Sequence, residues 1–227
     1  MPVSLIDEKI QIMKAAIIGA TGFVGQHITN ELVSRDIDVI GISRKEKVSQ
    51  QANLKYLAVD ATDVQALAAA LEGMDVVVSA FSPGWTNPDI YDDFISGSKA
   101  IQQAVRQSGV KRFISIGGAG SLYLPDGRQL VDTFPQDNPF VPGAKAARDY
   151  FNILKDEKDL DWVFFSPAMD MHQGITTGRT GKYRLGKDHP VMDEEGNNVL
   201  SGEDLAVVIA DEVEHPRHHQ QRFTAAY

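Results

Sequence analysis

Short apolar runs alternate with stretches of helical periodicity along most of the chain. Residues 15–18 and 75–81 are almost continuously apolar, as are strands buried on both faces of a parallel sheet. After the first run, apolar side chains recur every three or four positions at Val24, Ile28 and Leu32, the spacing of one helix face. Strands that alternate with helices predict an α/β domain, a doubly wound parallel sheet with helices on both faces.

The same pattern predicts the order of the elements. The predicted strands cover 15–18, 38–43, 54–60, 75–81, 112–117, 161–166 and 222–227. The predicted helices cover about 24–32, 62–71, 89–108, 144–155 and 202–215. Capping boxes are expected at Thr62 with Gln65 and at Ser201 with Asp204. Residues 124–142 form a long loop, a lid or pocket wall. The irregular stretch 168–200, with strand-like pieces at 183–185 and 199–200, is a small C-terminal embellishment on the substrate side.

Three glycines at three-residue spacing, Gly19, Gly22 and Gly25, lie between the first strand and the first helix. Gly19 permits a sharp turn, Gly22 lets the backbone approach a pyrophosphate, and Gly25 lets the helix pack close to the sheet. The helix N-terminus offers N–H groups and the positive end of its dipole to phosphates. A surface turn is the alternative for an isolated glycine trio, but strand, turn and helix together predict a dinucleotide-binding site.

We therefore interpret residues 13–227 as a single NAD(P)-binding domain with a Rossmann fold, and residues 1–12 as an N-terminal extension. Ligands of such sheets bind at the carboxyl ends of the strands. The functional residues are therefore expected in the loops that follow the strands.

The end of the second strand carries two cations, Arg44 and Lys45, about 20 residues after the glycines. An acidic residue there binds the ribose hydroxyls of NAD, whereas a cation accommodates the 2′-phosphate of NADP. Because a guanidinium binds phosphate bidentately, we favour a 2′-phosphate site at Arg44 over a solvated loop, although Glu46 lies nearby. Asp60, after the third strand, either contacts the adenine or bonds to its own turn.

The composition and net charge of the chain limit the kinds of molecule that it is expected to bind. Of 227 residues, 43% are hydrophobic and 23% charged, and the net charge is −9. Nucleic acids and anionic membranes attract basic patches, so neither is expected as a main partner. The chain contains no cysteine, which excludes disulfides, thiolate metal sites and cysteine nucleophiles. Because residues 1–11 do not resemble a signal peptide and no apolar run is long enough to span a membrane, we expect a cytoplasmic monomer or small homo-oligomer.

Four blocks of sequence resemble a known family. They are Gly-Ala-Thr-Gly-Phe-Val-Gly at 19–25, Val-Val-Val-Ser-Ala-Phe-Ser-Pro-Gly-Trp at 76–85, Ile-Gly-Gly-Ala-Gly-Ser-Leu at 116–122 and Arg-Thr-Gly-Lys-Tyr-Arg-Leu-Gly-Lys-Asp at 179–188. With them the chain resembles an atypical short-chain dehydrogenase/reductase. More narrowly, it resembles the NAD(P)H-binding group proposed to be NADH-flavin reductases, which is similar to biliverdin-IXβ/flavin reductase and to NmrA-like proteins. The resemblance covers nearly all of residues 13–227.

This resemblance implies a set of cofactor-binding residues. The pyrophosphate would be held by Gly19, Thr21, Gly22, Phe23, Val24 and Gly25, the 2′-phosphate by Arg44, and the adenine by Asp60 and Ala61. Ala80 and Phe81 would line the cofactor cleft, and Gly118 with its neighbours and Pro167 would border the nicotinamide.

One departure from the superfamily concerns the proton donor. Standard members use a Tyr-x-x-x-Lys pair, but the residue four before Lys145 is Val141, and Tyr150 follows at a different spacing. The nearest hydroxyls after the fifth strand belong to Ser121 and Tyr123. Reduction of a ketone to an alcohol needs an acid to protonate the developing alkoxide, so the sequence disfavours that reaction.

Other polar and aromatic residues have two interpretations. His172 could orient a substrate or donate a proton, but a loop histidine without such a task is commoner. The histidines at 215, 218 and 219 are interpreted as a solvated terminus, and no metal site is expected. Trp85 and Trp162 are expected to be packing residues, with Trp85 close enough to the cleft to touch a planar acceptor.

These features favour an NADPH-dependent reductase of a flavin, a quinone or a similar planar acceptor. The flavin would be a substrate and not a bound prosthetic group, and its reduction needs only orientation and a solvent proton. A non-catalytic NAD(P)-binding redox sensor of the NmrA type is the alternative. A sugar-nucleotide epimerase ranks last, because it needs the missing tyrosine. The catalytic candidates are Ser121, Tyr123, Lys145 and His172.

Overall fold

The structure is a computed structural model that describes residues 12–227. The expected extension at 1–12 therefore lies, apart from its last residue, outside the described part of the chain. In chain order the elements are β1 (Lys14–Ile18), α1 (Phe23–Ser34), β2 (Asp38–Ser43), β3 (Leu54–Ala58), α2 (Val64–Leu71), β4 (Val76–Ser79), α3 (Ile90–Ser108), β5 (Arg112–Ile116), the short 3-10 helices η1 (Ala119–Ser121) and η2 (Leu130–Thr133), α4 (Val141–Leu154), β6 (Asp161–Ser166), β7 (Arg184–Gly186), α5 (Gly202–Glu214) and β8 (Gln221–Ala226).

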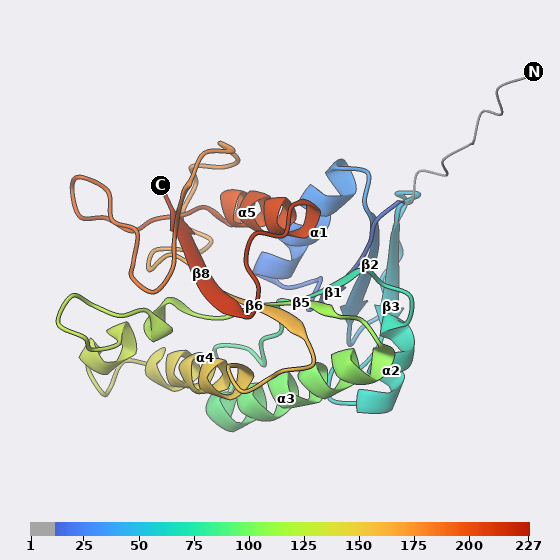
Figure 1. Cartoon of the computed structure of the whole chain (residues 1–227), viewed down its shortest axis with the longest axis horizontal. Coiled ribbons are helices and arrows are strands. Elements are labelled where there is room, and N and C mark those ends of the chain that lie inside the picture. The colour runs from blue at the N-terminus through green and yellow to red at the C-terminus, as the bar shows by residue number, and fades with distance from the viewer. Residues whose placement is uncertain (1–11) are drawn as a thin grey trace, which may run out of the picture.

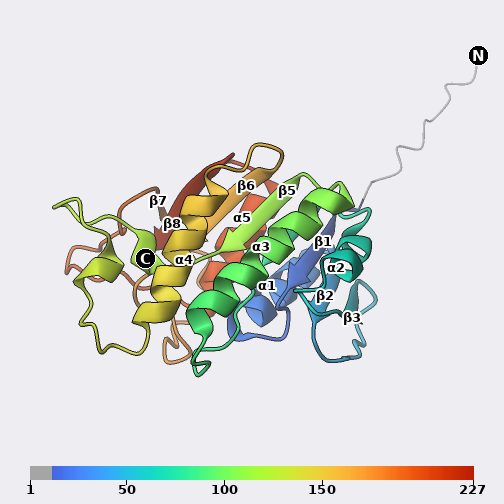
Figure 2. The same ribbon diagram turned by 90° about the horizontal axis from the view of Figure 1, so that it is seen from below.

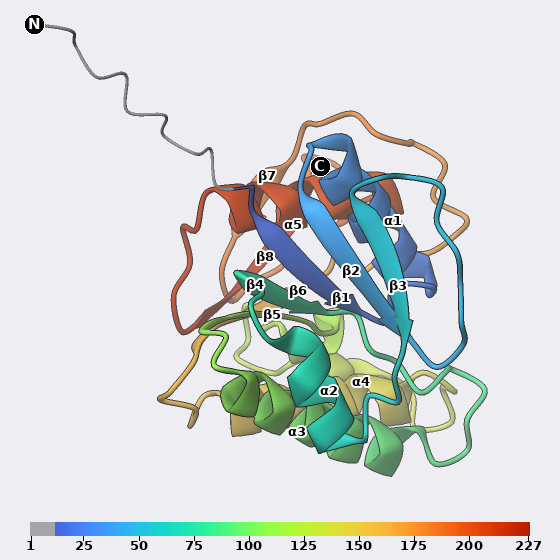
Figure 3. The same cartoon turned by 90° about the vertical axis from the view of Figure 1, so that its right-hand side faces the viewer.

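Within residues 12–227, eight strands form one sheet in the order β3-β2-β1-β4-β5-β6-β8-β7 (Figures 1 and 3). Every neighbouring pair is parallel except β7 with β8. The strand order runs outward in both directions from the pair β1 and β4. The crevice at the carboxyl ends of these two strands is the place where doubly wound sheets bind ligands. The predicted fold class is confirmed.

Helices cover both faces of this sheet (Figure 1). Helices α1 and α5 pack together on one face, and α2, α3 and α4 cover the other. Successive strand residues point to opposite faces, so Ile17 and Phe165 are buried under the first pair while Ile18 and Phe164 are buried under the other three. Burial on both faces explains the continuous apolar runs of the sequence. None of the helices in the described part of the chain is both long and apolar enough to cross a membrane.

The N-terminus of α2 differs from the expectation. The capping box at Thr62 and Gln65 is wrong, because Asp63 is the N-cap and accepts a 3.0 Å hydrogen bond from the N–H of Ala66. Thr62 instead donates its N–H and its hydroxyl to Asp60, at 2.9 and 2.8 Å. Where two residues with capping side chains are adjacent, the geometry of the preceding turn decides which of them caps the helix.

Other boundaries differ as well. Helix α4 begins at Val141, one turn earlier than predicted, since Pro142 suits the first turn of a helix and lacks the N–H that would be unpaired there. The strand expected at 199–200 is reduced to one isolated bridge between Asp170 and Val199. The N-cap of the last helix is confirmed, because the hydroxyl of Ser201 accepts the N–H of Asp204. The reciprocal bond of a capping box does not form, since the N–H of Ser201 donates to the hydroxyl of Tyr227 instead.

The C-terminal embellishment, residues 168–200, is attached to the helices by charged groups. Arg179 donates two hydrogen bonds of 2.8 Å to the buried carboxylate of Glu31 on α1. The fully buried carboxylate of Asp204 on α5 accepts both the N–H and the hydroxyl of Thr180. These bonds position a segment that has little secondary structure of its own.

The expectation of a solvated terminus after α5 is wrong for His218. This side chain is buried, with Nδ1 2.7 Å from Glu212 and its ring stacked 4.2 Å from that of Phe223. Glu212 also accepts a 2.5 Å hydrogen bond from Arg112 at the start of β5. The partners of His218 come from separate elements, so local sequence did not reveal them. Together they join α5, β5 and β8 at the amino edge of the sheet.

Replacing Glu31 with Gln should lower the free energy of unfolding at neutral pH by roughly 2 kcal/mol, the size of hydrogen bonds to buried charges. The hydrogen bonds of Arg179, then those of Arg35, hold the pKa of the Glu31 carboxyl below its usual value of 4.5. A lowered folded-state pKa contributes stability above the unfolded value, and this contribution is lost as the pH falls through the folded value. In urea titrations, the difference between the two proteins should therefore shrink below about pH 4.5. A difference that stays constant on acidification would contradict this role.

Candidate functional site

The turn after β1 requires glycine at its first position. Gly19 has a φ of +80°, and a Cβ there would lie 2.5 Å from the carbonyl oxygen of Ala80. The N–H of Gly19 donates to the carbonyl of Ile42 at 2.9 Å. The turn therefore brings together the ends of β1, β2 and β4 at the switch point of the sheet.

Helix α1 starts directly behind this turn. A Cβ on Gly25 would lie 2.1 Å from the carbonyl oxygen of Gly19, so the helix can approach the turn this closely only with glycine there. Gly22 is the N-cap, and no side chain caps the helix. Thr21 and Gly22 are both exposed. The N-terminus of α1 is thus open to an anion.

The side chains of Phe23 and Val24 do not face the turn. The ring of Phe23 lies 5.0 Å from that of His27, edge to face, and close to Gly202 at the start of α5. Val24 packs against the core under α1. These two side chains position the helix, so that only their backbone can serve the predicted pyrophosphate.

The ends of β2 and β3 are neighbours at the expected adenosine end. Hydrogen bonds from Thr62, and to a smaller extent the charge of Arg44, hold the pKa of Asp60 below its usual value. Asp60 is therefore bonded to its own turn, the local alternative that the sequence left open. Arg44 is exposed and Ala61 is buried. Contact of these residues with the cofactor stays a prediction.

Ala80 and Phe81 follow β4 on the other side of the switch point. The backbone of Ala80 touches the turn at Gly19, as described above. The ring of Phe81 occupies the space left by Gly97 on α3, where a Cβ would lie 2.5 Å from it, and packs 6.2 Å from the ring of Phe94. The side chain of Phe81 thus packs against α3, while the backbone of Ala80 lies at the switch point of the sheet.

The loop after β5 packs tightly against its neighbours. A Cβ on Gly117 would lie 1.9 Å from the ring of Phe164, and one on Gly118 would lie 3.5 Å from the Cβ of Ala147 on α4. Pro167 is buried directly after the adjacent strand β6. The loop predicted to border the nicotinamide therefore rests on β6 and α4.

Ser121 stabilises this loop through hydrogen bonds of its buried side chain. It is fully buried, and its hydroxyl lies 3.1 Å from the carbonyl oxygen of Gly118 and 3.0 Å from the hydroxyl of Ser166. The carbonyl of Ser121 accepts a 2.5 Å hydrogen bond from Arg222. These bonds place Ser121 among the residues that position the loop.

Arg222, which lies in β8 and is 3% exposed, is a positioning residue that was not predicted from the sequence. Its guanidinium lies 4.8 Å from the ring centroid of Phe151 and 5.3 Å from that of Tyr123, and it donates to the carboxylate of Asp188. The signal in the sequence was an arginine in a mostly apolar strand, because a buried cation needs specific partners. Arg222 thus ties β8 to the loop of Ser121, and Tyr123 packs on it.

The remaining two catalytic candidates lie apart from these. Lys145 is half-buried on α4 and shares a helix face with Asp149, one turn further along. His172 is exposed, and its Nδ1 accepts a 3.0 Å hydrogen bond from the N–H of Gly174 in its own turn. The four candidates follow strands at the carboxyl edge or lie on α4, but they do not assemble into one catalytic group.

The position of the superfamily's tyrosine is apolar here. Val141 is 7% exposed at the start of α4. Tyr150, further along the helix, is 1% exposed and bonds to Gln102 at 3.3 Å, and burial raises the pKa of its hydroxyl. Neither residue offers a proton to a substrate.

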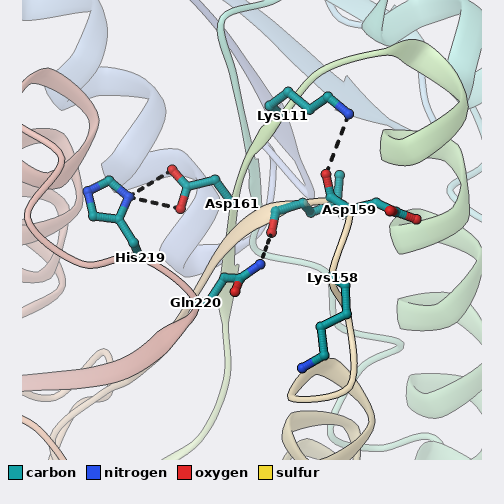
Figure 4. Close-up of a pocket in the computed structure, with 7 residues that line it drawn as sticks. Lys111, Lys158, Asp159, Asp161, His219 and Gln220 are labelled. Atoms are coloured by element: carbon teal, nitrogen blue, oxygen red, sulfur yellow. Dashed lines mark hydrogen bonds and ion pairs between the residues drawn. The ribbon is translucent and has the colours of Figure 1, made fainter.

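A surface hollow of about 310 Å³ lies at the opposite, amino edge of the sheet (Figure 4). It is lined by Lys111, Lys158, Asp159, Leu160, Asp161, His219 and Gln220. The ring of His219 is paired with the carboxylate of Asp161, with Nδ1 and Oδ1 2.9 Å apart. Among residues 12–227, no three His, Asp or Glu side chains come together as a metal site. Because the hollow lies at the amino edge of the sheet, it is separate from the candidate site at the carboxyl edge.

Comparisons with known proteins show the family to which the chain is related. A family model described as NAD(P)H-binding matches residues 19–216. The Bacillus subtilis protein YwnB, itself uncharacterised, is 30% identical over 216 residues, which cover 93% of this chain and 97% of that protein. A structure from Bacteroides thetaiotaomicron, of a protein proposed to be an epimerase, is 41% identical with a TM-score of 0.86, covering 96% of this chain and 98% of the other. A structure from Streptococcus pneumoniae, of a protein proposed to be an NADH-flavin reductase, is 33% identical with a TM-score of 0.80, covering 94% and 99%.

Two substitutions in the glycine motif should separate folding from ligand binding. Gly25→Ala places a methyl group 2.1 Å from the Gly19 carbonyl, and should lower the free energy of unfolding by about 2 kcal/mol or more. Gly22→Ala meets no atom closer than 3.4 Å, so it should leave stability nearly unchanged, yet its methyl group would obstruct a pyrophosphate. Thermal unfolding and calorimetric titration with NADPH measure the two effects. Equal stability of the two variants would contradict the packing role of Gly25.

Proposed function

The chain belongs to the family of NAD(P)H-binding proteins, and we propose that it is an NADPH-dependent reductase of a flavin, a quinone or a similar planar acceptor. NAD(P)H binding is the property of the family, whereas the acceptor and the preference for NADPH are the proposal. When bound, NADPH supplies a hydride, and the acceptor takes it up together with a proton from solvent. The protein then has to bind and orient two planar molecules.

The observation that carries the proposal is the buried Val141 in place of a tyrosine. Reduction of a ketone develops an alkoxide that needs a positioned acid, and the hydroxyls of Ser121 and Tyr150 are both buried in other contacts. Reduction of a flavin or quinone delivers electrons into a conjugated ring, whose heteroatoms exchange protons with water. A site that lacks the superfamily's tyrosine therefore suits this chemistry better.

The residues of the chain would act through positioning. The backbone at Gly22 and the N-terminus of α1 would hold the pyrophosphate. The loop at Gly118, kept in place by Ser121 and Arg222, would support the nicotinamide. Orientation alone is a large part of catalysis when two bound rings must meet face to face.

A preference for NADPH rests on the end of β2. Arg44 and Lys45 are both exposed there, beside the end of β3. A guanidinium can form two charge-assisted hydrogen bonds to a 2′-phosphate. Glu46 is exposed in the same loop, and its charge would favour the ribose hydroxyls of NADH instead.

A redox sensor of the NmrA type is the second candidate. It is favoured by the exposure of Trp85 and Phe140, which are 58% and 56% exposed and could contact a partner protein. Binding of NADPH without turnover, together with a partner, would support it. An epimerase ranks last, because Val141 occupies the position of the tyrosine that this chemistry requires.

The proposed activity is tested by mixing the purified protein with NADPH and, in turn, FMN, FAD and a quinone. We expect oxidation of NADPH that depends on both the protein and the acceptor. Tight binding of NADPH without reduction of any of the three acceptors would overturn the reductase and favour the sensor.

Replacing Arg44 with Asp should weaken NADPH binding roughly ten- to a hundredfold, the loss of one or two charge-assisted hydrogen bonds, and leave NADH binding nearly unchanged. The exposed Lys99 on α3 offers a control, because Lys99→Asp changes the net charge equally, away from the site. Isothermal calorimetry with both dinucleotides measures the effect. Unchanged affinity for NADPH in the Arg44 variant would refute the 2′-phosphate site.

A further inference from the structure

Two large aromatic side chains lie exposed at the carboxyl edge of the sheet. Trp85, in the loop after β4, is 58% exposed, and Phe140, just before α4, is 56% exposed. Their ring centroids are 5.5 Å apart, with an angle of 79° between the ring planes. Residues of this size usually bury most of their surface, so an exposed pair suggests a binding role.

The indole of Trp85 is held in place from one side. A Cβ on Gly143, in the first turn of α4, would lie 2.7 Å from Cζ3 of the indole and 2.9 Å from Cδ1 of Ile90. The indole therefore rests directly on the backbone of α4, next to the first residue of α3. Atoms Cζ3 and Cε3 of the indole lie against α4, while 58% of the residue is exposed to solvent.

The same turns of α4 also carry the loop predicted to border the nicotinamide. A Cβ on Gly120 would lie 3.2 Å from the Cβ of Ala144, and one on Gly118 would lie 3.5 Å from that of Ala147. Gly143 is the residue before Ala144, so Trp85 and this loop are neighbours on one helix. Figure 2 shows the starts of α3 and α4 side by side at this end of the sheet, and the two helices pack together.

We propose that Trp85 and Phe140 form the stacking platform on which the planar acceptor binds. This inference rests on the proposed function, and it assigns the acceptor ring of a flavin or quinone to the open side of the Trp85 indole. A flat conjugated ring matches that surface, because stacking gains contact area and aromatic geometry at little cost in side-chain entropy. The perpendicular ring of Phe140 limits how far the acceptor can slide.

The experiment measures the affinity of oxidised FMN for the protein saturated with NADP⁺, so that no turnover is needed. Trp85→Leu should raise the dissociation constant of FMN roughly ten- to a hundredfold, in line with the loss of one heterocycle–aromatic stack. Trp85→Phe should retain most of the affinity, because it retains a ring. Binding of NADP⁺ should be unchanged in both variants.

A second substitution tests the position of the ring without removing it. Gly143→Ala should displace the indole from α4 and weaken FMN binding in the same direction, while alanine suits a helix better than glycine. Leu185→Ala, on the exposed strand β7, is the control that removes apolar surface elsewhere. A long-wavelength charge-transfer absorbance on adding FMN, lost in Trp85→Leu, would report the stack itself.

The outcomes distinguish this proposal from the proposed function. FMN affinity that is unchanged in Trp85→Leu overturns the platform, whatever the turnover. So does the absence of binding to the wild type of both FMN and a quinone, menadione, titrated in the same way. Binding that depends on Trp85 without NADPH oxidation supports the platform and overturns the reductase. If Trp85→Leu changes only the self-association of the protein, the platform is overturned and this surface belongs to a contact between copies of the chain.

Discussion

The close contact between the first turn and the first helix is the constraint on which the site depends. Gly19, Gly25 and the backbone of Ala80 approach one another so closely that a methyl group at either glycine would overlap a carbonyl oxygen. This packing directs the N-terminus of α1 at the crevice where the strand order reverses. The adenosine end of a bound dinucleotide would then lie on the side of β2 and β3, and its nicotinamide end on the side of β5 and β6. Any ligand with a pyrophosphate between two ring systems would be laid across the sheet in this way.

The C-terminal third of the chain holds the loop after β5 in place, on the nicotinamide side of the predicted site. Arg222 in β8 reaches the carbonyl of Ser121, and the hydroxyl of Ser121 reaches the loop at Gly118. The embellishment is in turn attached to α1 and α5 through Glu31 and Asp204. Buried charges that join segments distant in the sequence give a fixed geometry to loops with little regular structure. Such a scaffold suits a protein whose chemistry is supplied by its ligands and whose own task is orientation.

The fold could be predicted from sequence because its signals are local and agree with one another. Apolar runs, helical periodicity and the glycine spacing all indicate the same parallel sheet, and the structure confirms it. The errors arise where a side chain finds its partner in another helix, strand or loop, whether near or far along the chain. His218 was predicted to be solvated, but Glu212 and Phe223 bury it. Ser121 was a candidate catalytic hydroxyl, but it is buried and bonded to Ser166 and Arg222. The prediction of the N-cap of α2 was wrong for a local reason. Thr62 and Asp63 are adjacent and both can cap a helix, and only the geometry of the preceding turn distinguishes them.

The claim that no side chain donates a proton during reduction is tested most directly by the pH dependence of a single turnover. With NADPH pre-bound and FMN in excess, the rate constant of hydride transfer should stay nearly constant between about pH 6.5 and pH 8.5, because no acid of the protein takes part in the step. A rate that falls along a titration curve of one group in that range would contradict the account, and the group that titrates would then have to be found among the side chains at the carboxyl edge.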